Sequence, residues 1–286
     1  MTPELIADYA CETGEGPLWH PEERRVYWVD IPRGRLFRYD PASGRHEQMY
    51  QSPEALGGFT LQEDGAFLLF GARGAISTLR DGVATVVIPE IAGEVDGRFN
   101  DVIAAPGGRV LCGTMPTETH DGRLYRLDPD RTLTTLLEGV TVSNGLGFTP
   151  DRTGVYHTDS LKRTITLFDY AEATGDMGNG RTFLDTTGEP GIPDGMTVDT
   201  EGCIWSARWD GGVLVRYAPD GREVSRVAFP ARKVSSAIFG GDDYTDLYVT
   251  TAGGQDKGAN GPGAGALYRL RPGVRGVPEF RSRIGL

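Results

Sequence analysis

Residues 13–19 read Thr13-Gly14-Glu15-Gly16-Pro17-Leu18-Trp19, and the same arrangement, a polar or glycine pair just ahead of a strand-like segment, recurs along the chain. Six copies are present, and successive pairs are 42 to 50 residues apart. The pairs are Glu15-Gly16, Gly57-Gly58, Asn100-Asp101, Asn144-Gly145, Asp194-Gly195 and Ser236-Ala237. A repeat of this size is typical of propellers and solenoids, and strand-rich copies favour the propeller.

Each copy contains three strand-like segments separated by turn residues. In the first copy, the second and third segments are residues 26–30 and 34–40. Residues 133–137 and 224–228 indicate a fourth, outer strand in two other copies. The pattern therefore predicts an all-β, six-bladed β-propeller with about four antiparallel strands per blade, built as one domain over residues 1–286.

A propeller must close its ring, because an open end would leave a sheet edge exposed. Residues 5–9 could pair with the last blade and close the ring. Residues 278–284 are the competing closing strand, and the pattern does not choose between the two.

Composition excludes several classes of partner. The net charge of −11 over 286 residues makes nucleic acid and anionic membrane surfaces poor partners. No run is apolar enough to span a membrane, and the first residues lack the pattern of a secretory signal. Three widely spaced cysteines favour reduced, buried thiols. We therefore expect a cytoplasmic protein.

Four oxygen-bearing side chains occupy equivalent positions of the repeat, namely Glu15, Asn100, Asn144 and Asp194. Each one alone is explained by a common turn dipeptide. A closed ring, however, brings all four to one axis, where two carboxylates would repel each other without a cation between them. Such a ligand set suits a hard divalent ion.

The third copy supplies a second polar cluster. Arg98 and Asn100 lie two residues apart, and Glu118 begins the loop that follows the next strand. All three should reach the same mouth of the ring, although a surface ion pair and a turn asparagine would explain them equally well. His157 lies inside a strand and is interpreted as a packing residue.

Five motifs carry a resemblance to a known family. They are Gly14-Glu15-Gly16-Pro17-Leu18-Trp19, Arg98-Phe99-Asn100-Asp101, Gly113-Thr114-Met115, Ser143-Asn144-Gly145 and Pro193-Asp194-Gly195-Met196. In this order they resemble the senescence-marker/gluconolactonase family, which includes regucalcin and bacterial sugar lactonases. The resemblance extends over nearly the whole chain. The segment 156–160 is more similar to bacterial aldonolactonases, particularly those for pentonolactones, than to animal regucalcins.

The resemblance implies a site as well as a fold. Glu15, Asn144 and Asp194 would bind one divalent ion. We expect Ca²⁺ first, with Mg²⁺, Mn²⁺, Zn²⁺ or Fe²⁺ as alternatives. Arg98, Asn100 and Glu118 would contact the substrate, with Asn100 reaching the ion directly or through water.

The implied reaction is hydrolysis of a sugar lactone to an aldonic acid by a metal-dependent enzyme. Asp194 is the candidate general base, and a metal hydroxide acting without Asp194 is the alternative. Three other functions stay open: a phosphotriester hydrolase, a non-catalytic calcium-binding regulator and a scaffold for protein partners. The expected partner is a small sugar lactone, and the expected state is a monomer or weak homo-oligomer.

Overall fold

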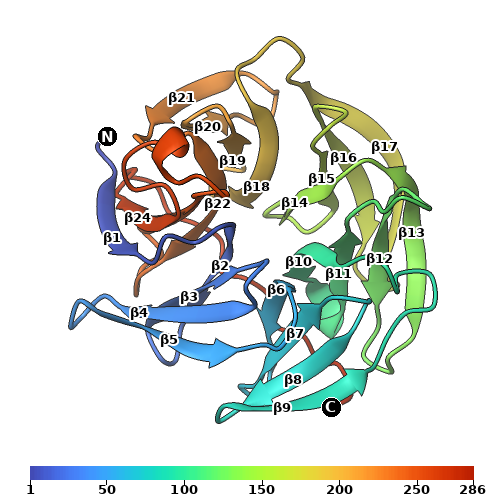
Figure 1. Ribbon diagram of the computed structural model, residues 1–286. Coiled ribbons are helices and arrows are strands. Elements are labelled where there is room, and N and C mark those ends of the chain that lie inside the picture. Colours follow the sequence, from blue (N-terminus) through green and yellow to red (C-terminus); the bar gives the residue numbers. More distant parts are fainter.

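The computed structural model describes residues 1–286 and contains six four-stranded antiparallel sheets arranged as the blades of a ring (Figure 1). Blade 1 consists of β2 (Gly14–His20), β3 (Arg25–Asp30), β4 (Arg35–Asp40) and β5 (Arg45–Gln51). Blade 2 consists of β6 (Leu56–Leu61), β7 (Phe67–Gly71), β8 (Ile76–Arg80) and β9 (Val83–Ile88). Blade 3 consists of β10 (Phe99–Ala104), β11 (Val110–Thr114), β12 (Gly122–Leu127) and β13 (Leu133–Val140).

The second half of the ring repeats this order. Blade 4 consists of β14 (Ser143–Phe148), β15 (Gly154–Asp159), β16 (Thr164–Ala171) and β17 (Asp176–Asp185). Blade 5 consists of β18 (Ile192–Val198), β19 (Ile204–Trp209), β20 (Val213–Tyr217) and β21 (Glu223–Ala228). Blade 6 consists of β22 (Lys233–Gly240), β23 (Asp246–Ala252), β24 (Ala266–Leu270) and β1 (Glu4–Asp8). The six-bladed, four-stranded propeller predicted from the repeat is confirmed.

The only helical elements are two short 3₁₀ turns, η1 (Pro106–Gly108) and η2 (Gly258–Asn260). Neither is long enough to cross a membrane.

The hydrophobic core lies between neighbouring blades. Tyr27 of blade 1 packs on Phe67 of blade 2 with ring centroids 4.7 Å apart, and Trp205 of blade 5 meets Phe239 of blade 6 at 6.1 Å. The innermost strands are buried along nearly their whole length. This explains why their sequences are apolar on both faces instead of alternating.

The six predicted pairs lie inside the innermost strands β2, β6, β10, β14, β18 and β22, not ahead of them as the sequence suggested. Each of these strands has an irregularity in its pairing with the next strand, at the predicted pair in β2, β6, β10, β14 and β18 and directly before it in β22. A β-bulge adds a residue to one strand and re-aims the side chains beside it. In blades 1, 3, 4 and 5 the irregularity lies beside Glu15, Asn100, Asn144 and Asp194, which line the axial cavity.

Close packing of these strands requires glycine. A Cβ on Gly57 would lie 2.0 Å from the carbonyl oxygen of Phe99 in blade 3, and one on Gly195 would lie 2.2 Å from Ser236 Oγ in blade 6. The second glycine follows Asp194 directly, so the approach of blades 5 and 6 helps to fix the backbone of that residue.

The N-terminal strand closes the ring. β1 pairs with β24 in antiparallel register, with Glu4 opposite Arg269 and Asp8 opposite Ala266. Figure 1 shows β1 beside β24 at the outer edge of blade 6. Of the two predicted closing segments, the N-terminal one is therefore confirmed, and the prediction of a closing strand at residues 278–284 is wrong.

The C-terminal residues instead run across the face of the ring where the innermost strands end. We call residues 274–286 the C-terminal strap. Its backbone exchanges hydrogen bonds with blades 2, 3, 5 and 6, and its side chains contact blades 1 and 4. These contacts join Ser282 to Leu61, Arg283 to Gly108, Arg275 to Thr200, Gly276 to Tyr244, Arg281 to Glu22 and Phe280 to Phe148.

Candidate functional site

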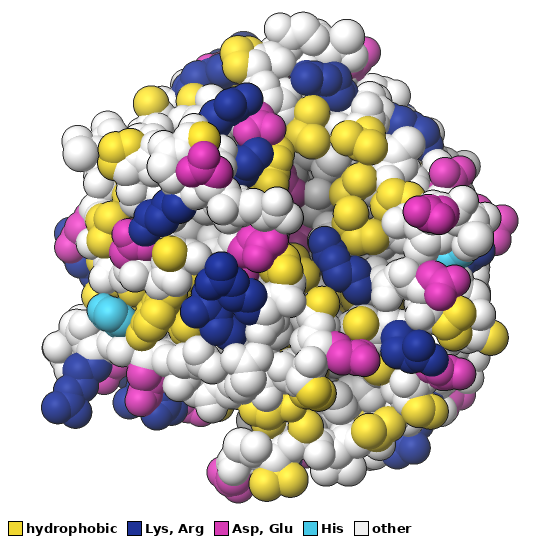
Figure 2. Space-filling model, viewed as in Figure 1, with side chains coloured by type: hydrophobic (Ala, Val, Ile, Leu, Met, Phe, Trp, Pro, Cys, Tyr) yellow, Lys and Arg dark blue, Asp and Glu magenta, His cyan; other side chains and the backbone are white.

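A cavity of about 230 Å³ lies on the axis, at the beginning of the innermost strands. Its walls are formed by Thr13, Glu15, Arg98, Asn100, Met115, Val142, Asn144, Ser160, Ile192, Asp194 and Trp209. The face seen in Figure 2 is hollowed at its centre, and acidic, basic and hydrophobic side chains surround the hollow. Five of the six residues predicted to bind metal or substrate therefore line one cavity.

Glu15, Asn144 and Asp194 are between 4% and 6% exposed, as is Asn100. The two amides are joined directly, because Asn100 Nδ2 donates to Asn144 Oδ1 at 2.9 Å and to the carbonyl oxygen of Ser143 at 2.8 Å. Asn144 Nδ2 in turn donates to Ser160 Oγ at 2.8 Å. The amide oxygen of Asn144 thus accepts one hydrogen bond and keeps a second lone pair available.

The two axial carboxyl groups are difficult to ionise together. Burial, followed by the charges of Asp194 and Asp101, raises the pKa of Glu15 well above its ordinary value. Burial, followed by Asp101, raises the pKa of Asp194 in the same direction. The only hydrogen bond to the carboxylate of Glu15 comes from the backbone of Gly16, at 2.9 Å. A cation on the axis would remove this repulsion.

Arg98 is the one basic side chain in the cavity wall. Its Nη1 donates to Asn100 Oδ1 and to the carbonyl oxygen of Phe99, each at 2.8 Å, so the guanidinium pairs with an amide and not with a carboxylate. Burial lowers the pKa of Arg98 to about 10, which leaves the side chain charged at neutral pH. Its Nε and Nη2 hydrogens have no partner in the chain and are free to bind a ligand.

Asp101 is the acidic residue that sequence reasoning did not assign to the site. Alternation along a strand would point it away from Asn100, but its φ of +21° and the bulge beside it break the alternation. Asp101 lines a second cavity of about 60 Å³ farther along the axis, together with Glu279 and Phe280 of the C-terminal strap. Burial raises the pKa of Asp101 to about 7.

The donor set fits a hard divalent ion. No group of three or more His, Cys, Asp or Glu side chains is placed to hold a metal ion, so a site on the axis must use an amide oxygen. Glu15, Asn144 and Asp194 supply two carboxylates and one amide, which are the ligands that calcium and magnesium prefer. With Asp101 nearby and Arg98 as the single cation, the ionised site would carry two uncompensated negative charges. A divalent cation would balance them.

Glu118 is not brought to the cavity. It is exposed at the tip of a turn in which Thr117 and His120 are hydrogen-bonded to each other, and it faces a shallow depression beside Asp96. Because that turn is closed by its own hydrogen bonds, it points Glu118 outward. The contact between Glu118 and a substrate stays a prediction that the geometry does not favour.

His157 is a packing residue, as predicted. It is 3% exposed, its Nε2 lies 2.9 Å from Ser143 Oγ, and burial lowers its pKa to about 4. It therefore supports the strand of Asn144 as a neutral side chain.

Part of the cavity wall is apolar. Met115, Val142, Ile192 and Trp209 line it together. Lys233 Nζ lies 4.5 Å from the centroid of the Trp209 ring and 2.6 Å from Asp210 Oδ1, which orients the indole from outside. The cavity wall thus combines polar and apolar side chains.

The fold and the cavity together define a six-bladed propeller that gathers carboxylates, amides and one guanidinium on its axis. Residues 13–253 match the family described as SMP-30/Gluconolactonase/LRE-like region, and the chain belongs to this family.

Two curated relatives and one solved structure illustrate the similarity. Pentonolactonase XacC of Haloferax volcanii is 48% identical over 295 residues, with 100% of both chains covered. The 6-deoxy-6-sulfogluconolactonase of Pseudomonas putida is 34% identical over 273 residues, with 93% of both covered. The crystal structure of a calcium-binding protein, regucalcin, from Agrobacterium tumefaciens has a TM-score of 0.92 at 27% identity, covering 99% of this chain and 98% of that one.

Proposed function

We propose that this protein is a metal-dependent hydrolase that opens aldonolactones to aldonic acids, with pentonolactones as the first candidate substrates. The observation that carries the proposal is the convergence of Glu15, Asn144 and Asp194, with Arg98 and Asn100 beside them, on one axial cavity. The names of two relatives, a pentonolactonase and a sulfogluconolactonase, support a sugar lactone as substrate.

The size of the cavity also supports a small substrate. Its volume of about 230 Å³ lies below the roughly 300–1,000 Å³ typical of sites for drug-sized ligands. A single sugar ring suits such a space, with its hydroxyl groups toward Arg98 and Asn100 and its C–H face toward Trp209.

Glu15, Asn144 and Asp194 would hold the ion, and Ca²⁺ is the first candidate because all the donors are oxygen atoms. When bound, a divalent ion polarises a carbonyl group and makes water more acidic. A solved relative described as a calcium-binding protein supports the same choice of ion.

The roles of the side chains follow from their positions. Asp194 would accept the proton from the attacking water, since it is a buried carboxylate in the cavity wall. Arg98 would donate to the substrate through Nε and Nη2. Asn100 would keep both Arg98 and Asn144 in place through its amide. Water adds to the lactone carbonyl carbon, the ring C–O bond breaks, and the ring oxygen takes up a proton to become a hydroxyl group.

A substrate panel tests this proposal. Proton release at neutral pH would be compared for xylonolactone, arabinonolactone, gluconolactone and galactonolactone, and for a phosphotriester, with Ca²⁺ present. We expect turnover of at least one lactone well above its spontaneous rate and little turnover of the phosphotriester. Preferred turnover of the phosphotriester would replace the proposal with phosphotriester hydrolysis. Calcium binding with no turnover of any compound would point to a regulator.

A further inference from the structure

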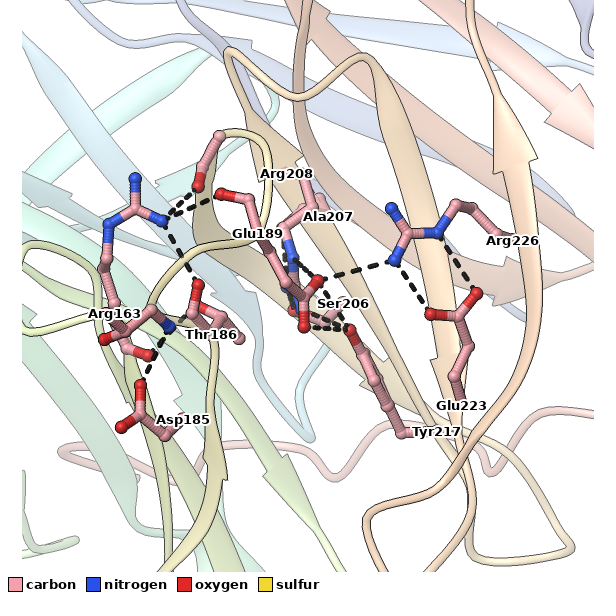
Figure 3. A network of polar contacts seen from close by, with 12 residues as sticks. Arg163, Asp185, Thr186, Glu189, Ser206, Ala207, Arg208, Tyr217, Glu223 and Arg226 are labelled. Carbon is pink, nitrogen blue, oxygen red and sulfur yellow. Dashed lines mark hydrogen bonds and ion pairs between the residues drawn. The ribbon is translucent and has the colours of Figure 1, made fainter.

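The backbone that leads to Asp194 is held from two neighbouring blades (Figure 3). We call residues 186–193 the approach segment. It follows β17 of blade 4, crosses to blade 5, and carries Ile192 of the cavity wall two residues before Asp194. Gly188 has a φ of +90° and Gly191 a φ of +71°. Because glycine has the greatest backbone freedom, a segment with two such residues needs external contacts to stay in one conformation.

Arg163 of blade 4 supplies most of these contacts. Its Nη1 lies within hydrogen-bond distance of the carbonyl oxygens of Thr186 (3.3 Å), Glu189 (3.1 Å) and Gly191 (2.8 Å). Its own carbonyl oxygen accepts hydrogen bonds from the backbone N–H and the hydroxyl of Thr186, at 2.9 and 3.0 Å. Figure 3 shows the guanidinium of Arg163 directed at the approach segment. Arg163 does not line the cavity.

The same turn of blade 4 also contacts the proposed ligand Asn144 and the residue before the proposed ligand Asp194. Ser160, 1% exposed, accepts a hydrogen bond from Asn144 Nδ2 at 2.8 Å and donates to the carbonyl oxygen of Pro193 at 2.7 Å. Arg163 N donates to the carbonyl oxygen of Ser160 at 3.0 Å, so the turn is one closed unit. The distance between Asn144 and Asp194 is thereby coupled to the position of this turn.

Blade 5 holds the other side of the approach segment through Glu189. The Glu189 carboxylate accepts a hydrogen bond from Tyr217 at 3.1 Å and lies 3.7 Å from Nε of Arg208, a fully buried arginine. Arg208 is also the cross-strand neighbour of Pro193. In Figure 3, Glu189 lies between Arg208 and Arg226. The approach segment is therefore clamped between an arginine of blade 4 and one of blade 5.

We propose that Arg163 is a positioning residue, which fixes Asp194 in its axial place from outside the cavity by holding three carbonyl groups of the approach segment. This inference rests on the proposed function in one respect: Asp194 is taken as a ligand of the divalent ion. Partners that orient a ligand typically contribute 10- to 100-fold to metal affinity or activity.

The test compares Arg163→Met, which keeps the bulk and removes the donors, with Arg163→Lys, which keeps one charged donor. Arg181→Met is the matched control, because Arg181 is an exposed arginine of the same blade that pairs only with Asp169. Two quantities would be measured on the folded proteins: the Ca²⁺ dissociation constant by calorimetry, and hydrogen exchange of the amides at 187–194.

We expect Arg163→Met to weaken Ca²⁺ binding by about 10- to 100-fold and to speed exchange in the approach segment. The Ca²⁺ affinity and the exchange rate of Arg163→Lys should lie between those of Arg163→Met and the unmodified protein. Arg181→Met should change neither quantity. Unchanged Ca²⁺ affinity in Arg163→Met would overturn the inference, whether or not exchange in the approach segment becomes faster. If Arg163→Met does not fold, Arg163→Lys decides by the same two measurements.

The two proposals fail in different ways. An unmodified protein that binds no divalent ion contradicts the proposed function and removes the ligand role of Asp194. Normal ion binding by the unmodified protein and by Arg163→Met alike contradicts only the positioning role of Arg163.

Discussion

Replacing Asp194 with asparagine is expected to lower lactone hydrolysis by a factor of about 10² to 10⁴, the usual contribution of a general base. The loss of activity should lie near the larger of these factors, because the same change also removes a charged ligand of the ion. Asparagine keeps the shape of the side chain, so the loss of activity would reflect the missing carboxylate charge and not an empty space left by a smaller residue. The measurement is the rate of proton release with saturating lactone and Ca²⁺.

The same substitution should stabilise the ion-free fold. Burial, followed by Asp101, raises the pKa of Asp194 in the folded state. A carboxyl with a raised folded pKa favours folding fully below its unfolded pKa of about 3.9 and loses that contribution as pH rises toward the folded pKa. Asparagine has no such loss. With a chelator present, the melting temperature of Asp194→Asn should therefore exceed that of the unmodified protein at pH 7, and the difference should shrink toward pH 4.

Asp169→Asn is the control, since Asp169 is an exposed aspartate on the outer part of blade 4. It should leave activity unchanged, and because hydrogen bonds from Arg181 and Asn179 lower the pKa of Asp169, it should not raise the melting temperature at pH 7. An Asp194→Asn variant with near-normal turnover would leave the role of base to another group. One that is less stable without the ion at pH 7 would contradict the electrostatic account of the site.

Ending the chain at Gly273, which removes the C-terminal strap, is expected to lower the melting temperature by about 10 °C or more. The strap contributes backbone hydrogen bonds to four blades and buries Ser282 and Ile284 almost completely. Removing a buried isoleucine side chain alone typically costs about 2–5 kcal/mol, and each lost hydrogen bond about 1 kcal/mol. In a chain of this size, each kcal/mol shifts the melting temperature by roughly 2 °C.

A chain that ends at Gly285 is the control, because Leu286 is 61% exposed. It should have the same melting temperature as the full-length protein. Since β1 already closes the ring, the shortened chain should keep its β-sheet circular dichroism while melting at a lower temperature. Equal melting temperatures for the two truncations would show that the strap is not needed for stability.

The repeat predicts most of the fold because equivalent blades need equivalent residues. Glu15, Asn144 and Asp194 could be assigned to one axis since they share the same position in the pattern, and all three line the axial cavity. A glycine beside a polar residue is also a turn signal, so the sequence pattern predicts these pairs ahead of the strands. In the structure the glycines lie within strands, where they allow β-bulges and close packing.

Other features depend on contacts that no local pattern records. Asp101 lines the second, smaller cavity because a bulge and a positive φ break the alternation of its strand. Glu118 lies outside the cavity because it belongs to a hydrogen-bonded turn that directs its side chain outward. Residues 278–284 have the composition of a strand, yet the edge of blade 6 is already occupied by β1. Arg163 and Glu189 lie 26 residues apart, and only the crossing from blade 4 to blade 5 brings them together.

The measurement that tests the central claim most directly is lactone hydrolysis by protein freed of metal with a chelator and then titrated with Ca²⁺. Glu15→Gln, in which one proposed charged ligand is neutralised, would be titrated in parallel. We expect the spontaneous rate without the ion, full activity near one equivalent, and a much higher Ca²⁺ requirement for Glu15→Gln. Undiminished hydrolysis by protein shown to be free of metal would contradict a metal-dependent mechanism.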